Sequence, residues 1–298
     1  ELDRHVAKQR PGPVGLGDLV RTQHPSEGNG TRTRCRRDQR AYRCGAMVYR
    51  VPRRPQLVGH MGYPAKEPAN TVASARAAVA AGADMVEIDV SMTADRHPIA
   101  IHGPKLEHST TGSGRVDRST LDHVKALQVK RRGEVVPGMS VPLVTEIVED
   151  LDGVAFNFDL KTGRAMRPVL AMIEAEDLAD RCVVSGATAW RVGRVLRAAP
   201  DVTVLLNLNR VDKVLARTRL GPWWLTTRYR RLLRKPRVAA LNINHNWVSP
   251  ALVRRAHALG ADLWASTVDD AERAAQLAEL GVDSITTNRI GEITLPAT

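Results

Sequence analysis

Two carboxylates, Glu87 and Asp89, lie two residues apart within the apolar run MVEIDV at residues 85–90. Side chains at positions i and i+2 of a β-strand point to the same side, so both acids would face one neighbourhood. Neighbouring carboxylates repel each other and are costly to bury unless a cation or a basic group lies beside them. Oxygen ligands suit Mg²⁺ or Ca²⁺. The pair therefore predicts a divalent-cation site, with an ion pair to an arginine as the alternative.

The run FNFDLK at residues 156–161 repeats the same spacing. Asp159 would supply a third acidic ligand to the cation. Lys161, on the same side of that strand, could neutralise a phosphate oxygen. The alternative for these two residues is an internal ion pair between them.

Two histidines, His60 and His102, each end an apolar run and are followed within two residues by glycine. A lone histidine is most often a core residue. Two at such positions, beside an expected cation site, are better interpreted as a proton acceptor and a proton donor. Together with the acidic residues they predict phosphodiester cleavage, whereas no cofactor motif favours redox chemistry.

The elements that must position these residues alternate along the chain, short apolar strands with helices of about 12 residues. Asn70 or Thr71 would cap the first of these helices. The nine expected strands cover residues 56–62, 85–90, 98–103, 154–161, 181–186, 202–208, 238–244, 261–268 and 283–288. The pattern predicts an α/β fold, a (β/α)₈ TIM barrel with one surplus strand. A doubly wound sheet is the alternative, but no G-x-G-x-x-G follows the first strand. The barrel is favoured because polar residues lie where its strands end, which is where barrels place their active sites.

Composition divides the chain and limits its partners. Residues 1–46 are rich in Pro, Gly and Arg without periodicity, so we expect a disordered basic segment, translation from Met47, and a barrel domain over 47–298.

The net charge of +12 suits an anionic partner, although no nucleic-acid recognition module is present. The three cysteines lack metal-binding spacing. With no signal-peptide pattern and no apolar run of roughly 20 residues, we expect a cytoplasmic protein.

One basic segment, residues 209–237, holds ten Lys and Arg residues together with Trp223, Trp224 and Tyr229. Basic residues with interfacial aromatic side chains favour peripheral contact with an anionic membrane. The alternative is an outer barrel helix whose charges are merely solvated.

Six separated blocks resemble the glycerophosphodiester phosphodiesterase family in order and spacing, over roughly residues 56–290. They read GHMGYPAKEPANT, GADMVEIDVSMTADRHPIAIHGPKLEHSTTGSGRV, VPLVTEIV, FNFDLK, WASTVDD and LGVDSITTN. The resemblance implies a TIM barrel of the phospholipase C-like phosphodiesterase type. It also implies metal-dependent hydrolysis of glycerophosphodiesters to an alcohol and glycerol 3-phosphate, in lipid metabolism. By resemblance the site residues are His60, His102 and Lys161 for catalysis, Glu87, Asp89 and Asp159 for Mg²⁺ or Ca²⁺, and Lys161 and Trp264 for substrate binding.

The chain departs from the family pattern at several positions. Met61 stands where the family usually has Arg, Ala69 where it has Glu, and Gly103 where it has Asp. The stretches GHM, IHG and FDLKTG are similar to the sphingomyelinase D-type phospholipases. Two alternatives therefore stay open. One is a phospholipase D-like enzyme acting on lysophospholipid or sphingomyelin, and the other is a catalytically impaired barrel that binds a phosphorylated ligand.

Overall fold

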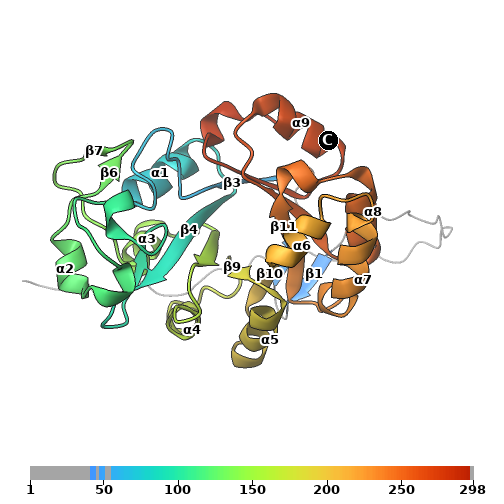
Figure 1. The fold of residues 1–298 in the computed structure, drawn as a ribbon, viewed down its shortest axis with the longest axis horizontal. Coiled ribbons are helices and arrows are strands. Elements are labelled where there is room, and N and C mark those ends of the chain that lie inside the picture. Colours follow the sequence, from blue (N-terminus) through green and yellow to red (C-terminus); the bar gives the residue numbers. More distant parts are fainter. Residues whose placement is uncertain (1–40, 45–46, 51–54, 296–298) are drawn as a thin grey trace, which may run out of the picture. The chain divides into compact units, whose positions relative to one another are not determined.

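The computed structural model describes residues 41–44, 47–50 and 55–295 (Figure 1). Eight parallel strands close into a barrel, because β3 pairs with β13 on one side and with β4 on the other. The expected (β/α)₈ barrel is thus confirmed. Its strands are β3 (Gln56–Gly59), β4 (Met85–Met92), β8 (Phe156–Leu160), β9 (Cys182–Ala187), β10 (Thr203–Asn207), β11 (Val238–Asn244), β12 (Asp262–Ser266) and β13 (Ser284–Thr287).

The surplus strand is β5 (Pro98–Ala100), which pairs antiparallel with the upper part of β4. The expected strand at 98–103 was therefore too long, and His102 does not end a barrel strand as His60 does. Strand β4 can accept this partner because its pairing with β3 involves only Met85 and Val86. The chain turns back along β4, so that the Ile101 N–H donates to the Asp89 carbonyl at 3.0 Å. This return places His102 beside Asp89.

A small second core holds the returning strand in place. Residues 104–141, for which the sequence predicted no element, contain α2 (Leu121–Lys125) and the hairpin of β6 (Lys130–Arg131) and β7 (Glu134–Val135). Ile99 and Ile101 are fully buried against side chains of this insertion. The cluster is completed by Leu106, Val116, Val124, Val129 and Val141.

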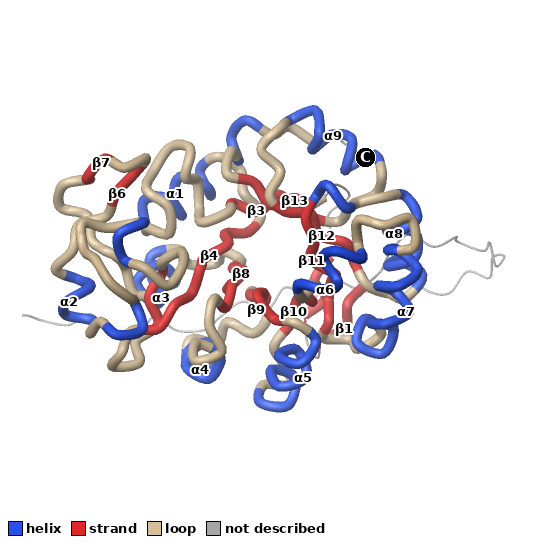
Figure 2. The backbone as a smooth tube through the Cα atoms, viewed as in Figure 1, coloured by secondary structure: helices blue, strands red, loops and turns tan. Residues whose placement is uncertain are grey.

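Helices surround the ring of strands, as Figure 2 shows. They are α1 (Val72–Ala80), α3 (Val144–Asp150), α4 (Met166–Ala175), α5 (Ala189–Ala198), α6 (Arg210–Leu215), α7 (Gly221–Leu233), α8 (Pro250–Ala258) and α9 (Ala271–Glu279). Thr71, rather than Asn70, caps α1, since its hydroxyl accepts from the Ser74 N–H at 3.1 Å. Among the described residues, no helix has both the length and the apolar character needed to cross a membrane.

The two-residue period of the strands separates the main core from the barrel interior. On β4, Val86, Ile88 and Val90 are buried in the core under the helices, whereas Glu87 and Asp89 point inward. The lower interior is filled by an apolar cluster of Val58, Met85, Val183, Leu205, Ala240 and Trp264. Polar side chains therefore gather above this cluster, toward the carboxyl ends of the strands.

The N-terminal segment lies largely outside the described residues. Within residues 1–46, the structure describes only β1 (Ala41–Cys44), which pairs antiparallel with β2 (Met47–Arg50). The expected disorder of residues 1–46 and the expected start at Met47 stay predictions, since most of these residues lie outside the described ranges.

Candidate active site

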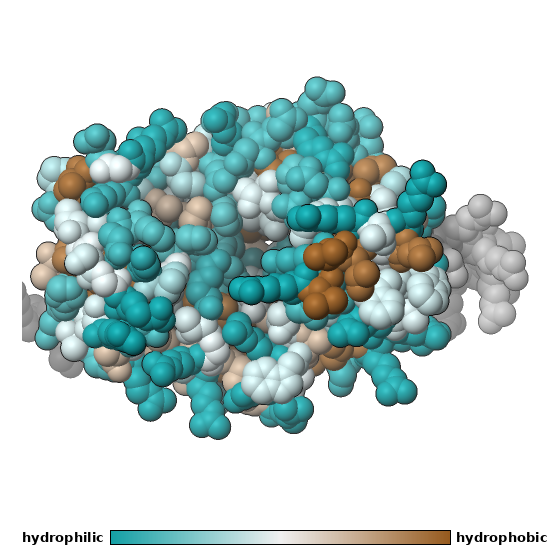
Figure 3. Space-filling model, viewed as in Figure 1, coloured by the Kyte–Doolittle hydropathy of each residue, from teal (hydrophilic) through white to brown (hydrophobic). Residues whose placement is uncertain are grey.

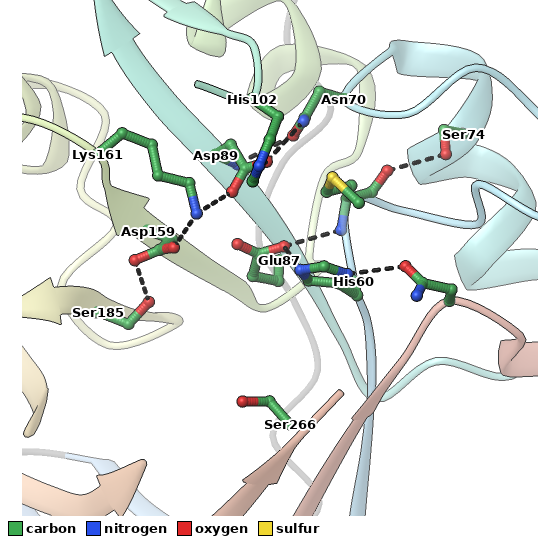
Figure 4. A network of polar contacts seen from close by, with 12 residues as sticks. His60, Asn70, Ser74, Glu87, Asp89, His102, Asp159, Lys161, Ser185 and Ser266 are labelled. Carbon is green, nitrogen blue, oxygen red and sulfur yellow. Dashed lines mark hydrogen bonds and ion pairs between the residues drawn. The ribbon is translucent and has the colours of Figure 1, made fainter. Parts of the chain in front are cut away.

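Three acidic side chains from two adjacent strands meet inside the barrel mouth (Figure 4). Asp89 of β4 is the register partner of Asp159 of β8, and Glu87 lies two residues below Asp89. One carboxylate oxygen from each of the three lies within 4.8 Å of the others. Glu87 and Asp89 are buried. An all-oxygen donor set of this kind fits a hard divalent cation such as Mg²⁺ or Ca²⁺.

Lys161 lies among the acids and forms ion pairs with Asp89 and Asp159. The internal ion pair expected from the sequence as an alternative is therefore present together with the acidic cluster. Three carboxyl groups face one ammonium group, so the cluster offers more acidic oxygens than Lys161 alone can pair. This surplus of acidic ligands supports the assignment of a cation site at Glu87, Asp89 and Asp159.

The environment of the cluster shifts the pKa values of its two buried acids in opposite directions. Burial, followed by the charges of Asp89 and Asp159, raises the pKa of Glu87 well above its usual range. Burial would also raise the pKa of Asp89, but the hydrogen bond from His102 and the charge of Lys161 outweigh it and lower that pKa. For Lys161, burial favours the neutral amine, yet the charges of Asp159, Asp89 and Glu87 raise its pKa. The ammonium form of Lys161 is therefore firmly held in the site.

His60 follows β3 and is oriented by residues at the end of β13. Its Nδ1 lies 2.7 Å from Oδ1 of Asn288. The Asn288 amide is fixed in turn, because its Nδ2 donates to Oδ2 of Asp269 at 2.8 Å. An amide oxygen only accepts, so Nδ1 of His60 carries a proton, and in the neutral imidazole the free lone pair is on Nε2. Nε2 faces the acids, 3.9 Å from Oε2 of Glu87.

His102 reaches the site from the opposite side of the carboxylates. Its Nδ1 donates to Oδ2 of Asp89 at 2.8 Å, and 57% of its side chain remains exposed. This hydrogen bond raises the pKa of His102, against the opposing effect of its partial burial. The structure thus brings together all six polar residues that the sequence assigned to catalysis and metal binding.

Trp264 is not brought to the mouth with the others. It is only 4% exposed and packs in the apolar cluster of the lower barrel interior. A side chain so enclosed has almost no surface to offer a ligand, so its expected contact with substrate gains no support from the structure.

The sequence pointed to Asn70 only as a possible helix cap, but it is a partner of Asp89. Its Nδ2 donates to Oδ2 of Asp89 at 3.0 Å, and its Oδ1 accepts from the Asp89 N–H at 2.9 Å. Asn70 has a φ of +58°, which asparagine tolerates better than most residues. The sequence does hold one indication of this role. A helix needs only one cap, so with Thr71 at the cap the neighbouring polar Asn70 is available for another contact.

Two further contacts orient the acids. The Met61 N–H donates to Oε2 of Glu87 at 2.8 Å, and the Ser185 hydroxyl donates to Oδ1 of Asp159 at 3.2 Å. No sequence pattern points to the first contact, because it uses a backbone group. Ser185 lies two residues from Val183 on β9 and shares its inward side, which is a signal that strand periodicity could have supplied.

Comparison with known proteins agrees with this geometry. The model of the Glycerophosphoryl diester phosphodiesterase family matches residues 60–292. The chain belongs to this family. All the residues of the site described above, His60 to Asn288, fall within the matched range.

Relatives cover most of the chain. The glycerophosphodiester phosphodiesterase of Caldanaerobacter subterraneus is 26% identical over 242 residues, which are 78% of this chain and 93% of that protein. A glycerophosphodiester phosphodiesterase of Arabidopsis thaliana is 25% identical over 244 residues, which are 78% of this chain and 70% of that protein.

Solved structures share the barrel fold. An Oleispira antarctica phosphodiesterase in complex with the product sn-glycerol-3-phosphate aligns with a TM-score of 0.65 at 22% identity, covering 80% of this chain and 95% of that one. The glycerophosphodiester phosphodiesterase of Agrobacterium tumefaciens aligns with a TM-score of 0.63 at 21% identity, covering 80% of this chain and 97% of that one.

Proposed function

We propose that this chain hydrolyses glycerophosphodiesters to an alcohol and glycerol 3-phosphate, with a divalent cation held by Glu87, Asp89 and Asp159. The observation that carries the proposal is the pair of histidines on either side of an acidic cluster, each with its Nδ1 committed to an oxygen acceptor. Each imidazole is left with Nε2 available for proton transfer. Membership of the family, and the product bound to the related Oleispira antarctica enzyme, support the choice of substrate.

The two acceptors differ in charge, and this difference assigns the roles. Asp89 is a carboxylate that favours the protonated imidazolium of His102, so His102 is the proton donor. Asn288 is a neutral amide that holds the Nδ1–H tautomer of His60 without favouring its imidazolium as a carboxylate would, so we assign His60 as the proton acceptor. His60 takes the proton of the glycerol hydroxyl next to the phosphate as that oxygen bonds to phosphorus. His102 gives its proton to the departing alcohol oxygen as the phosphorus–oxygen bond to that alcohol breaks. A water molecule, which loses a proton to His102, then opens the cyclic phosphate to glycerol 3-phosphate while His60 returns its proton to the glycerol oxygen.

Positive charge in the site offsets the charge of the phosphate. Lys161 would contact a phosphate oxygen while it remains paired with Asp89 and Asp159. A divalent cation, when bound, would supply further neutralisation of the phosphate. The proposed metal dependence thus rests on the acidic cluster, in which one lysine faces three carboxylates.

The decisive experiment measures glycerol 3-phosphate release from glycerophosphocholine with Mg²⁺ or Ca²⁺ present, and then with EDTA added. We expect turnover that EDTA abolishes, and a fall of roughly 1000-fold in kcat for His60→Ala and for His102→Ala. The exposed His123 provides the matched control, since His123→Ala removes an imidazole outside the site. Turnover that resists EDTA, or that survives loss of either site histidine, would contradict the proposal.

A parallel assay of choline release from lysophosphatidylcholine tests the phospholipase D-like alternative. Choline release without any turnover of glycerophosphocholine would replace the proposed substrate by a lysophospholipid. If the folded protein binds the cation but turns over neither substrate, the result would favour the alternative of a catalytically impaired barrel that binds a phosphorylated ligand.

A further inference from the structure

An exposed apolar patch lies on the segment that connects β10 to β11. Six large apolar side chains are exposed among the described residues, and four of them fall within residues 211–223. Val211, Val214, Leu220 and Trp223 expose 67%, 63%, 70% and 54% of their surface. We call these four residues the rim patch. Exposed apolar side chains gathered in this way mark an interaction surface.

The rim patch lies on the same face of the barrel as the proposed active site. Helix α6 begins at Arg210, shortly after β10 ends at Asn207, so it lies at the carboxyl ends of the strands. Apolar side chains over α6 border the hollow at the centre of this face in Figure 3. The turn after α6 is attached to the barrel as well, because the Arg217 guanidinium lies 5.4 Å from the ring centroid of Trp247, which follows β11. A partner bound to the rim patch would therefore face the barrel mouth.

The exposed charges of the segment that carries the rim patch have one sign. Segment 209–237 contains ten basic residues and a single acid, Asp212. Asp212 is fully buried, pairs with Arg228, and accepts hydrogen bonds from Tyr229 and from Trp224 Nε1. Its negative charge is thus turned inward. The exposed charged side chains next to the rim patch in sequence are Arg210, Lys213, Arg217 and Arg219.

Three exposed basic residues later in the segment lie toward the other end of the barrel. Helix α7 runs away from the rim patch, and the chain after it reaches the start of β10, where the Arg237 carbonyl accepts from the Val204 N–H at 2.8 Å. Arg230, Arg231 and Arg234 on this lower part of the segment are exposed as well. The segment therefore carries two groups of exposed cations. The upper group, Arg210, Lys213, Arg217 and Arg219, is interleaved in sequence with the rim patch, and the lower group, Arg230, Arg231 and Arg234, is not.

We propose that the rim patch and its cations are a docking surface for an anionic lipid bilayer, which holds the barrel mouth against the membrane. Apolar side chains on a segment whose exposed charges are all cations fit the interface of anionic lipids, where the cations meet phosphate groups and the apolar groups enter the acyl boundary. A second copy of this chain fits less well, because an isologous contact would place the same cations opposite one another. The inference rests on the proposed function for what docking achieves: access of the site to phosphodiesters carried in the membrane.

The test compares two variants that lose the same number of charges. Binding to sedimented vesicles of phosphatidylglycerol and phosphatidylcholine is measured for Arg210→Gln/Lys213→Gln/Arg219→Gln and for the control Arg230→Gln/Arg231→Gln/Arg234→Gln. The upper variant should bind roughly 100-fold more weakly, since each cation at an anionic surface adds a comparable increment. The vesicle binding of the control variant should change by less than about threefold if only the upper group reaches the lipid surface. Equal losses in the two variants, or no binding of the unaltered protein at low salt, would overturn the proposal.

A third variant tests the apolar part. The variant Val211→Ser/Val214→Ser/Leu220→Ser/Trp223→Ser changes only exposed side chains, so it should keep its fold. Circular dichroism checks that it does. It should lose vesicle binding and hydrolysis of vesicle-borne lysophospholipid while it keeps its turnover of soluble glycerophosphocholine. A shift from dimer to monomer in this variant, without any loss of vesicle binding, would instead assign the patch to self-association and overturn the membrane proposal.

The two proposals fail separately in these experiments. Vesicle binding that depends on the rim patch, in a protein that turns over no glycerophosphodiester, would leave the docking surface standing and reject the proposed function. Turnover of glycerophosphocholine, with vesicle binding that does not depend on the rim patch, would support the proposed function and reject the docking surface.

Discussion

Nδ1 of His60 lies 2.7 Å from Oδ1 of Asn288, and this contact joins the two strands at which the barrel closes. Strands β3 and β13 pair in register from Gln56 and Ser284 onward, so the residues that follow them emerge side by side. The amide of Asn288 receives its orientation from Asp269. A hydrogen-bond chain three residues long thus fixes the tautomer of the proposed proton acceptor.

The hydrogen bonds from His60 through Asn288 to Asp269 can be tested by exchange of the donor and acceptor groups. Asn288→Leu should lower kcat by roughly 10- to 100-fold, because His60 loses the acceptor that orients it. Asn288→Asp alone would place a carboxylate against Asp269 and should be similarly impaired. The double variant Asn288→Asp/Asp269→Asn restores one acceptor toward His60 and one amide donor between the two positions. Steady-state kinetics should show partial recovery in the double variant, with the activity displaced to higher pH because the new carboxylate favours the imidazolium of His60. A simple sum of two losses would argue against the orienting role.

Asn70 should be required for both stability and activity. It is buried and makes two hydrogen bonds with Asp89. Asn70→Gly keeps the backbone conformation but leaves Asp89 without these partners, which should cost about 3 kcal/mol of unfolding free energy. Asn70→Ala should cost about 1 kcal/mol more, because its φ of +58° is unfavourable for alanine. Urea unfolding of the two variants measures the difference, and near-wild-type stability of Asn70→Gly would show that the pair contributes little.

Removal of one carboxylate should stabilise the metal-free protein. Glu87 is buried beside Asp89 and Asp159, so Glu87→Gln should raise the unfolding free energy in EDTA by about 1–3 kcal/mol. The raised pKa of Glu87 means that its folded form holds a proton more tightly than its unfolded form. Its contribution to stability is therefore present at low pH and is lost as pH rises through the raised pKa.

The advantage of Glu87→Gln over wild type should accordingly grow with pH in EDTA. Urea unfolding over a pH series measures it, with Glu149→Gln at an exposed position as the charge-matched control. Addition of Mg²⁺ or Ca²⁺ should raise the Tm of wild type and of the control but not that of Glu87→Gln. An equal metal response in all three proteins would place the cation elsewhere.

Gly186 should be essential to the position of Asp159. A Cβ at residue 186 would lie 2.4 Å from Oδ1 of Asp159 and 2.6 Å from the Leu160 carbonyl oxygen, at a φ of +71°. Gly186→Ala should therefore cost about 2–4 kcal/mol of unfolding free energy and weaken metal binding, measured by calorimetric titration. Gly163 is the matched control, since a Cβ there meets nothing within 4 Å and Gly163→Ala should change stability by less than about 0.5 kcal/mol.

The sequence alone determined the barrel and the chemistry-bearing residues for clear physical reasons. Alternation of apolar strands with helices predicts a parallel sheet, and the two-residue period of β4 places Glu87 and Asp89 on one side. Acids on the apolar strands β4 and β8 are costly unless they serve a site, so Glu87, Asp89 and Asp159 stood out without any coordinates.

Only the tertiary structure decided which residues orient this chemistry. Asn70 and Asn288 are separated in sequence from the groups they bind, and asparagine is equally common in turns, so no local pattern distinguishes an orienting amide from a turn residue. The place of His102 likewise depends on the antiparallel return of β5 and on the small core that holds it. Local periodicity identifies the inward side chains of a strand, but the partners of those side chains follow from how distant strands close the barrel.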